Sequence, residues 1–337
     1  MRKPVFGFFR QENRETINTL NLFRLKLCYA NNIDAVAFNL SDVDFENKTI
    51  NASYWTKDGL KQEITQIPHL IEYGPATEYR SFFRENATII DDFNLSKEDV
   101  NNLLLKTELA NMVIPTICTT TAHNALKFSL MCNETILKPL ANSQGRGILC
   151  VKPTPDGGYT FTDSTQEIGT FNLQESVDFL TEQYGNSRIL VQPRMSFRNK
   201  DGQTMDFRVT VSKNGKGEWE LIFILPRTAR NSIVSNVSSG GYASELEPLL
   251  GIEYAENADK VRRELHHIAK TLPPIIEKAS GCYMLSLGID VGIDFETLNP
   301  YIIEVNYVPQ VHFKGNLQYY YTQSDYIAYL VKKLNLT

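Results

Sequence analysis

Two polar side chains lie close together in an otherwise apolar segment, Tyr301-Ile-Ile-Glu-Val-Asn-Tyr-Val-Pro309. Its β-branched and apolar residues predict a strand, and Glu304 and Asn306 are two residues apart, so they project from one face. A carboxylate beside a carboxamide is costly to bury without a partner, and oxygen ligands of this kind suit Mg²⁺. A solvated strand end would also accommodate both residues, and this segment taken alone favours that simpler interpretation.

A further carboxylate is expected opposite this pair. Residues 287–294 and 301–306 are predicted to form a hairpin, in which directly opposed residues share a face. If Asp290 lies beside Glu304 and Asn306, three oxygen donors converge. Asp294 is four residues further on, about 13 Å away along a strand, which is too far to bind the same ion. Asp290, Glu304 and Asn306 are therefore the predicted metal ligands.

A lysine followed by a glycine-containing loop forms a second constellation. Lys138 lies at the end of a predicted strand over 135–139, and the segment Leu140-Ala-Asn-Ser-Gln-Gly-Arg-Gly-Ile148 leads to another strand over 148–152. Glycines let backbone N–H groups approach a phosphate closely, and the lysine adds a point charge. The loop is not a Walker A motif, because Gly-Lys-Ser/Thr is missing and no helix clearly follows. The alternative is an ordinary exposed hairpin loop.

An arginine on a strongly alternating segment is the third candidate. Residues 205–212 place Met, Phe, Val and Val on one face and Asp, Arg, Thr and Ser on the other, which predicts a strand. Arg208 on the polar face could bind a phosphoryl group or a carboxylate through two parallel hydrogen bonds. An internal ion pair near Asp206 is the alternative. No Ser-His-Asp or Cys-His arrangement can be argued, because no nucleophile-elbow sequence is present.

The elements that must position these residues divide the chain into three predicted domains, 1–113, 114–192 and 193–337. In the first, strands at 5–9 and 36–38 flank a helix over 15–30, which predicts a parallel α/β domain. It lacks the Gly-x-Gly-x-x-Gly fingerprint of a dinucleotide site. A helix capped by Ser96 is expected to run to Met112 and to stop before Pro115.

The two later domains are predicted to be mixed. The second has a helix over 126–130 capped by Thr120 or Thr121, a strand pair at 148–152 and 159–162, a helix over 173–184 and a strand over 189–192. The third has a hairpin of 205–212 with 219–225, a long helix over 259–280 interrupted by Pro273-Pro274, and a final helix over 325–334.

Composition excludes several classes of function. The chain has 337 residues, 42% of them hydrophobic and 22% charged, as in an ordinary globular protein. Its net charge of −5 gives no basic surface for nucleic acid or an anionic membrane, and no apolar run is long enough to cross a bilayer. The five cysteines are scattered and odd in number, which indicates free thiols in a reducing, cytoplasmic setting.

The order of these segments resembles that of ATP-grasp enzymes, and more closely that of the YheC/YheD family of endospore coat-associated ATP-grasp proteins. The matching segments are Ile136-Leu-Lys-Pro139, Gln144-Gly-Arg-Gly-Ile148, Leu190-Val-Gln-Pro193, Asp206-Phe-Arg-Val209, Arg227-Thr-Ala-Arg230, Asn236-Val-Ser-Ser-Gly-Gly241, Gly288-Ile-Asp-Val-Gly-Ile-Asp294 and Ile303-Glu-Val-Asn306. They cover roughly residues 100 to 310. The resemblance implies an α/β and α+β architecture, in which an N-terminal pre-ATP-grasp α/β domain precedes two subdomains that hold ATP between them.

The resemblance also implies roles for particular residues. Lys138 and Lys106 would contact the nucleotide, under a mobile lid formed by Ser143, Gln144, Gly145, Arg146, Gly147 and Ile148. The adenine would be read by the strand end Gln192, Pro193, Arg194 and Met195, through the Gln192 carbonyl and the Met195 N–H. One or two Mg²⁺ ions, or Mn²⁺ in their place, would be held by Asp290, Glu304 and Asn306. Arg208 would stabilise the transferring phosphoryl group, and Arg227, Asn236, Gly240 and Gly241 would face the acceptor.

The activity implied is a carboxylate–amine ligase, which activates an amino-acid or peptide carboxylate as an acyl phosphate and captures it with an amine. A structural, spore-coat-type protein without activity and an ATP-grasp kinase are the alternatives, and many relatives are homodimers. Two departures concern substrate choice. The family's Tyr-Asn-Arg before the linker is replaced by Glu72-Tyr-Gly-Pro75, and Gln310 follows Pro309 where many relatives carry a small residue.

Overall fold

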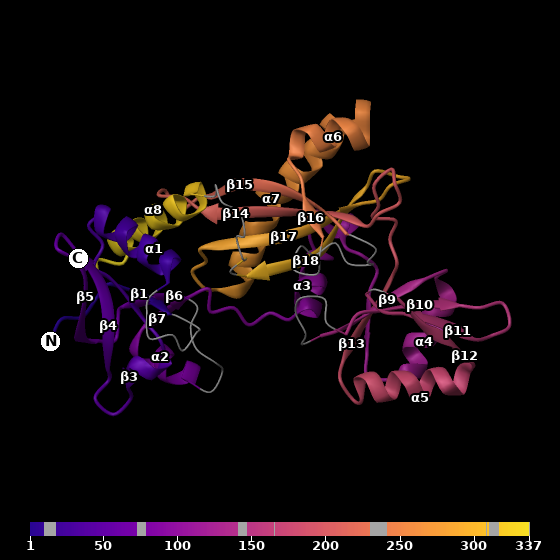
Figure 1. The fold of residues 1–337 in the computed structure, drawn as a ribbon, viewed down its shortest axis with the longest axis horizontal. Coiled ribbons are helices and arrows are strands. Elements are labelled where there is room, and N and C mark those ends of the chain that lie inside the picture. The colour runs from indigo at the N-terminus through magenta and orange to yellow at the C-terminus, as the bar shows by residue number, and fades with distance from the viewer. Residues whose placement is uncertain are drawn as a thin grey trace.

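Three β-sheets organise the chain, and each is built from a different stretch of the sequence (Figure 1). The computed structural model describes residues 1–9, 18–72, 79–140, 147–164, 166–229, 241–307, 309 and 317–336. In Figure 1 the first and second sheets lie at opposite ends of an elongated molecule, with the third sheet between them. One sheet falls in each of the three predicted domains, whose boundaries stay a prediction.

The first sheet is mixed, and its centre is parallel. It has the order β3-β4-β2-β1-β6-β7, with β5 paired to β4. The β-α-β opening is confirmed, because β1 and β2 run parallel on either side of a helix whose N-cap is Asn18. The elements are β1 (Phe6–Phe9), α1 (Thr19–Ala30), β2 (Ala35–Phe38), β3 (Val43–Asp44), β4 (Thr49–Thr56), β5 (Gly59–Gln66), β6 (Leu70–Glu72), α2 (Arg80–Asn86) and β7 (Thr88–Ile90).

The second sheet is antiparallel and is covered by two helices. Its order is β12-β11-β10-β9-β13-β8. Thr121, one of the two predicted caps, begins α4, and Asn172 caps α5 through a capping box with Glu175. The elements are β8 (Ile117–Thr119), α4 (Ala122–Met131), β9 (Thr135–Pro139), β10 (Leu149–Pro153), β11 (Tyr159–Thr162), β12 (Glu167–Phe171), α5 (Leu173–Tyr184) and β13 (Ile189–Pro193).

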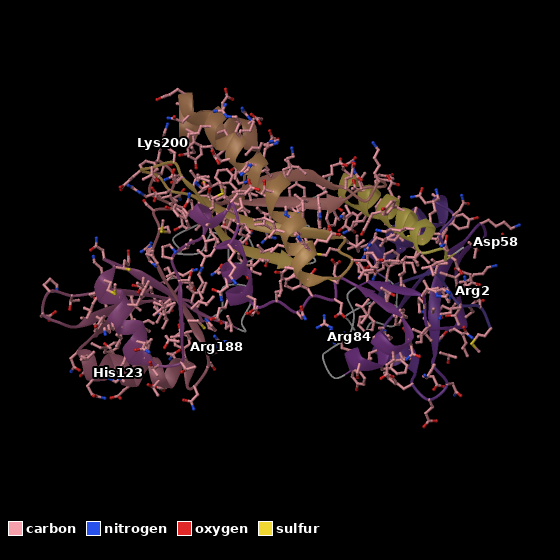
Figure 2. The ribbon with its side chains drawn as sticks, turned by 180° about the vertical axis from the view of Figure 1, so that it is seen from behind. Arg2, Asp58, Arg84, His123, Arg188 and Lys200 are labelled. Atoms are coloured by element: carbon pink, nitrogen blue, oxygen red, sulfur yellow. The ribbon has the colours of Figure 1, made fainter. Side chains whose placement is uncertain are left out.

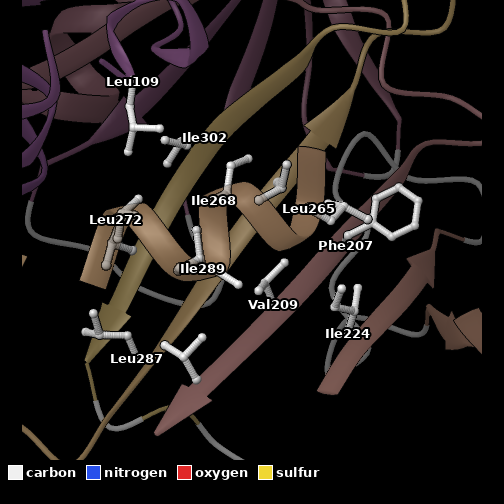
Figure 3. Packing of buried hydrophobic residues seen from close by; sticks show 14 of the residues in the cluster. Leu109, Phe207, Val209, Ile224, Leu265, Ile268, Leu272, Leu287, Ile289 and Ile302 are labelled. Atoms are coloured by element: carbon white, nitrogen blue, oxygen red, sulfur yellow. The ribbon is translucent and has the colours of Figure 1, made fainter. Parts of the chain in front are cut away.

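The third sheet carries the largest core. Its order is β16-β15-β14-β17-β18, with every pair antiparallel. Figure 3 shows α7 lying across the sheet, with Leu265, Ile268 and Leu272 packed against Val209 and Ile289. The elements are β14 (Met205–Lys213), β15 (Trp219–Thr228), β16 (Tyr242–Ala243), α6 (Leu246–Tyr254), α7 (Ala258–Ser280), β17 (Ser286–Ile293) and β18 (Pro300–Tyr307).

The predicted interruption of one helix and the predicted end of another are wrong. The interruption expected at Pro273-Pro274 does not occur, because α7 runs through both prolines. Proline removes backbone hydrogen bonds there, but Leu272, Pro273 and Ile276 are buried, and that packing holds the helix together. The helix capped by Ser96 ends early: α3 spans Lys97–Leu104, and a separate 3₁₀ turn follows at Ala110–Met112.

The early end of α3 has a local cause. The Thr107 hydroxyl donates to the Leu104 carbonyl at 2.8 Å, which satisfies a carbonyl at the helix end. The same hydroxyl accepts from the Leu109 N–H at 3.2 Å and so turns the chain. The N-terminal cap is as predicted, since Ser96 and Asp99 form a capping box.

Two segments pack on a sheet that is distant in sequence. Val100, Leu104 and Leu109 join the core of the third sheet, and Val113 forms a parallel bridge with Ile302. The last helix, α8 (Leu317–Lys333), packs instead on the first sheet beside α1 (Figure 1). It begins earlier than the predicted helix over 325–334, because its first turns bury polar side chains that hydrophobic periodicity does not detect.

A core substitution in α7 is expected to test the packing of the third sheet. Leu265 is fully buried, so Leu265→Ala should lower the free energy of unfolding by about 2–5 kcal/mol. Lys270→Ala on the exposed face of the same helix is the matched control and should change it by less than about 0.5 kcal/mol. Urea denaturation followed by circular dichroism measures both, and equal losses would contradict this description of the core.

Candidate active site

The hairpin of β17 and β18 brings the three predicted metal ligands together. Asp290 lies directly opposite Glu304, and Gly288 lies opposite Asn306. The Asn306 side-chain amide donates to Asp290 Oδ2 at 3.1 Å. The sequence-derived pairing of the two strands is therefore confirmed, while the role of these residues as ligands stays a prediction.

Two arginines hold the Asp290 carboxylate. Arg208 on β14 lies opposite Asp290 and donates two hydrogen bonds to it, one of them from Nη2 to Oδ2 at 3.0 Å. Arg227 on β15 reaches the same carboxylate, with Nη2 2.9 Å from Oδ1. Burial tends to raise the pKa of Asp290, but the two guanidinium groups hold it below its ordinary value. Asp290 is thus an anion shared by two cations.

The ion pairs extend from Asp290 to a second buried carboxylate. Arg227 donates to Asp206 through two hydrogen bonds, Nε to Oδ1 at 2.7 Å and Nη2 to Oδ2 at 2.6 Å. Asp206 and Arg227 are each only 6% exposed. Burial lowers the pKa of Arg227, but Asp290 and Asp206 raise it far above its ordinary value, so Arg227 is permanently charged.

Two lysines lie near the same pair of carboxylates. Lys97, the first residue of α3, lies with its Nζ 3.1 Å from Glu304 Oε1. Lys138, on β9 of the second sheet, interacts electrostatically with Glu304, Lys97 and Asp290. Burial and the nearby Lys97 lower the pKa of Lys138 to about 8, while Glu304 and Asp290 oppose that shift. The second and third sheets therefore meet across a cluster of lysines, arginines and carboxylates.

Lys97 is the site residue that sequence reasoning missed. The only signal was its position directly after the Ser96 cap, at a helix start that was correctly predicted. Lys106 had been chosen instead, as a residue inside that helix. That placement is wrong: α3 ends at Leu104, and Lys106 is exposed in the following turn, at the opposite end of α3 from Lys97. The structure brings Lys97, not Lys106, to the carboxylates.

The oxygen donors fit a hard divalent cation in their chemistry. Asp290 and Glu304 are carboxylates and Asn306 supplies an amide, all on neighbouring strands, as Mg²⁺ prefers. Their negative charge is balanced in this structure by Lys97, Arg208 and Arg227. Over the described ranges, no group of three or more His, Cys, Asp or Glu side chains could hold a metal ion.

The segment expected to read adenine begins with the last two residues of β13, where the chain leaves the second sheet for the third. Gln192 is buried and its side-chain amide donates to Thr116 Oγ1 at 2.8 Å. Arg194 pairs with Glu134 at 2.7 Å, and Pro193 and Met195 are half-buried. The Arg188 side chain, which Figure 2 labels, pairs with Glu98 and so links the second sheet to α3.

The remaining predicted residues are placed only in part. Gly147 adopts a φ of 71°, which favours glycine, and its carbonyl accepts a hydrogen bond from the Tyr184 hydroxyl at 2.8 Å. Ile148 leads into β10, and Gly241 precedes β16. The other candidates in these loops lie outside the described residues: Ser143, Gln144, Gly145, Arg146, Asn236 and Gly240.

Comparison with solved structures defines the class of fold. The D-cycloserine synthetase DcsG superposes with a TM-score of 0.58 at 11% identity, covering 96% of this chain and 99% of that one. N5-carboxyaminoimidazole synthetase from Staphylococcus aureus, complexed with ADP, gives 0.54 at 10% identity, covering 96% and 77%. The ATP-grasp ligase PsnB, complexed with a precursor peptide and AMPPNP, gives 0.52 at 12% identity, covering 97% and 98%. The fold is that of the ATP-grasp proteins.

Sequence comparison then gives the family. The model of the YheC/D-like ATP-grasp family matches residues 86–332, and the chain belongs to that family. The endospore coat-associated protein YheD of Bacillus subtilis (strain 168) is 23% identical over 280 residues, which is 76% of this chain and 60% of that protein. YheC of the same organism is 24% identical over 168 residues, 46% of this chain and 44% of that protein. The aligned part thus spans 60% or less of these relatives. Among the described residues, no helix is long and apolar enough to cross a membrane.

Proposed function

We propose that the protein is an ATP-dependent ligase that joins the carboxylate of an amino acid or peptide to an amine. One observation carries this proposal: Lys97, Lys138, Arg208 and Arg227 converge on Asp206, Asp290 and Glu304 between two sheets. Among the described residues, four cations face three anions, and a positive balance of this kind suits the phosphates of a nucleotide. ATP-grasp relatives of similar fold are ligases, and two of those structures contain ADP or AMPPNP.

The proposed reaction has two steps. A carboxylate oxygen of the first substrate attacks the γ-phosphorus of ATP, the bond from that phosphorus to the bridging oxygen breaks, and ADP leaves. The amine nitrogen then attacks the acyl carbon, the carbon–oxygen bond to phosphate breaks, and the amine proton is lost to solvent. Arg208 and Arg227 would stabilise the charge that develops on the transferring phosphoryl and acyl phosphate oxygens.

The other predicted residues take matching roles in this proposal. Lys138 binds the phosphates, with Lys97 as a second lysine in place of Lys106. The loop from Ser143 to Ile148 covers them, and the Gln192–Met195 segment reads the adenine. Mg²⁺, or Mn²⁺, would be held by Asp290, Glu304 and Asn306, where its charge would neutralise phosphate oxygens. Arg227, Asn236, Gly240 and Gly241 would contact the acceptor.

The setting of the protein is also proposed. All five cysteines are free in the structure, which suits a reducing compartment such as the cytoplasm. We propose a homodimer as the working assembly, with amino acids or peptides as substrates and neither nucleic acid nor membrane as a partner.

A phosphate-release screen over amino acids and short peptides tests this function. ATP turnover should require both a carboxylate and an amine, and mass spectrometry should find a product equal to their sum minus water. A stable phosphorylated acceptor would instead indicate a kinase. Failure of Mg-ATP to raise the melting temperature would favour a structural protein without nucleotide binding, because a ligand of the native state must stabilise it.

Nucleotide binding is expected to weaken above about pH 8. Lys138 in the free protein loses its proton near that pH, and phosphate contacts favour the protonated form. Affinity is therefore complete below the free-state pKa of about 8 and falls as the pH rises through it, by up to about tenfold per pH unit. Calorimetry with AMPPNP between pH 7 and 9.5 measures the slope. Lys138→Arg keeps its charge throughout and should lack this slope. If the wild type and Lys138→Arg showed the same pH dependence of affinity, Lys138 would not be a phosphate ligand.

A further inference from the structure

The two arginines on Asp290 are held in different ways. Both hydrogen bonds that Arg208 makes within the described part of the chain end on Asp290. Arg227 contacts Asp290 through one nitrogen, and it also donates two hydrogen bonds to Asp206. If Asp290 were given another cation, Arg208 would lose its carboxylate, whereas Arg227 would keep one.

The two arginines also differ in how deeply their side chains are buried. Arg227 and Asp206 have side chains that are 7% and 8% exposed, while the side chain of Arg208 is 16% exposed. Arg208 lies across Gly288 on the neighbouring strand, where a Cβ would come within 3.2 Å of Arg208 Cδ and 3.3 Å of Nη1. Because Gly288 has no side chain, Arg208 and Pro309 both pack directly on its backbone, opposite Asn306. Arg227 is the more deeply buried of the two arginines.

We propose that Asp206 is a positioning residue that keeps Arg227 fixed when Asp290 accepts a divalent cation, and that Arg208 is the arginine then released towards the phosphates. Asp290 cannot hold two guanidinium groups and a dication with equal strength, because like charges repel at short range. Arg208, which makes no hydrogen bond to a second carboxylate within the described ranges, gives way first. This inference rests on the proposed function, and it gives a physical reason why two arginines that share Asp290 have different tasks.

The first experiment removes the anchor of Arg227. In Asp206→Asn, Arg227 loses its charged partner and turns to Asp290, where it competes with the dication. We expect the Mg²⁺ concentration at half-maximal AMPPNP binding to rise about tenfold, the scale of a hydrogen bond to a charged group.

A matched control comes from the first sheet. Glu72 on β6 accepts two hydrogen bonds from Arg24, at 2.7 and 2.6 Å, and is similarly buried at 8% exposure. Glu72→Gln should lower the melting temperature, as any loss of a buried pair does, without moving the Mg²⁺ midpoint. If Asp206→Asn moves that midpoint no more than Glu72→Gln does, Asp206 serves stability alone and the inference is overturned.

The second experiment releases Arg208 without a metal. In Asp290→Asn the carboxylate charge that holds Arg208 is gone, so AMPPNP in EDTA should bind about tenfold more tightly than to the wild type. Adding Arg208→Gln should abolish that gain. Unchanged affinity in Asp290→Asn would overturn the inference, and this holds even if Asp206→Asn does not fold. If the wild type binds no AMPPNP even with Mg²⁺, the proposed function itself fails. If the wild type binds it but the variants change nothing, only this inference fails.

Discussion

Glu304→Ala is expected to lower ATP turnover by about 10²–10³-fold, the range seen when a group that stabilises developing charge is removed. Glu304 is opposite Asp290 in the hairpin and is paired with Lys97, so its loss removes the anion at the centre of the site. The change also leaves Lys97 and Lys138 facing each other. Because Glu304 raises the pKa of Lys138, that pKa should fall below about 8 in the variant.

Phosphate release under saturating substrates measures the effect. Glu304→Gln keeps the shape of the side chain and removes the charge, so it should be nearly as inactive as the alanine variant. Glu247→Ala removes a carboxylate from an exposed pair with Arg262 on α6 and should leave turnover unchanged. Full turnover in Glu304→Ala would exclude this hairpin as the site of phosphoryl transfer.

Lys138→Met is expected to change binding and stability in opposite directions. Methionine fills a similar space without charge, so AMPPNP should bind about 10–100-fold more weakly, as expected for lost hydrogen bonds from a charged donor. The nucleotide-free protein should instead melt at a higher temperature. Folding lowers the pKa of Lys138, so at pH 7 the charged lysine opposes the folded state, and that opposition is lost as the pH rises from about 8 to the ordinary lysine pKa of 10.5.

The two readouts are measured on one sample by thermal denaturation with and without nucleotide. Lys152→Met is a suitable control, because Lys152 is an exposed lysine on β10 of the same sheet. It should alter neither the binding of AMPPNP nor the melting temperature. A parallel loss of both in Lys138→Met would mean that Lys138 is structural.

Local patterns were enough to predict most strands of the third sheet. The alternation along 205–212 placed Phe207 and Val209 in the core, and both are fully buried. Other strands gave no such signal. β5 was missed because most of its side chains are at least partly exposed and, in the described part of the sheet, it pairs only with β4. β12, at one edge of the second sheet, was missed for the same reason.

The site was predictable only where it depends on neighbours in sequence. Asp290 and Glu304 belong to one hairpin, so their pairing followed from strand period and turn. The contacts of Arg227 with Asp206 and Asp290 depend on the order of β15, β14 and β17 in the sheet. The pairing of Lys97 with Glu304 depends on how α3 packs on the third sheet. Such long-range packing leaves no periodic trace in the sequence.

The position of α8 has a consequence for the order in which the chain assembles. Tyr326, Ile327 and Leu330 complete the buried cluster of Phe6 and Phe8, although they are synthesised after all the other described elements. The buried cluster of the first sheet is therefore incomplete until residues 317–336 have left the ribosome. The second sheet has no such delay, because its buried cluster comes from residues 117–191 alone within the described ranges. Because synthesis proceeds from the N-terminus, the second sheet can complete its buried cluster before the first sheet does.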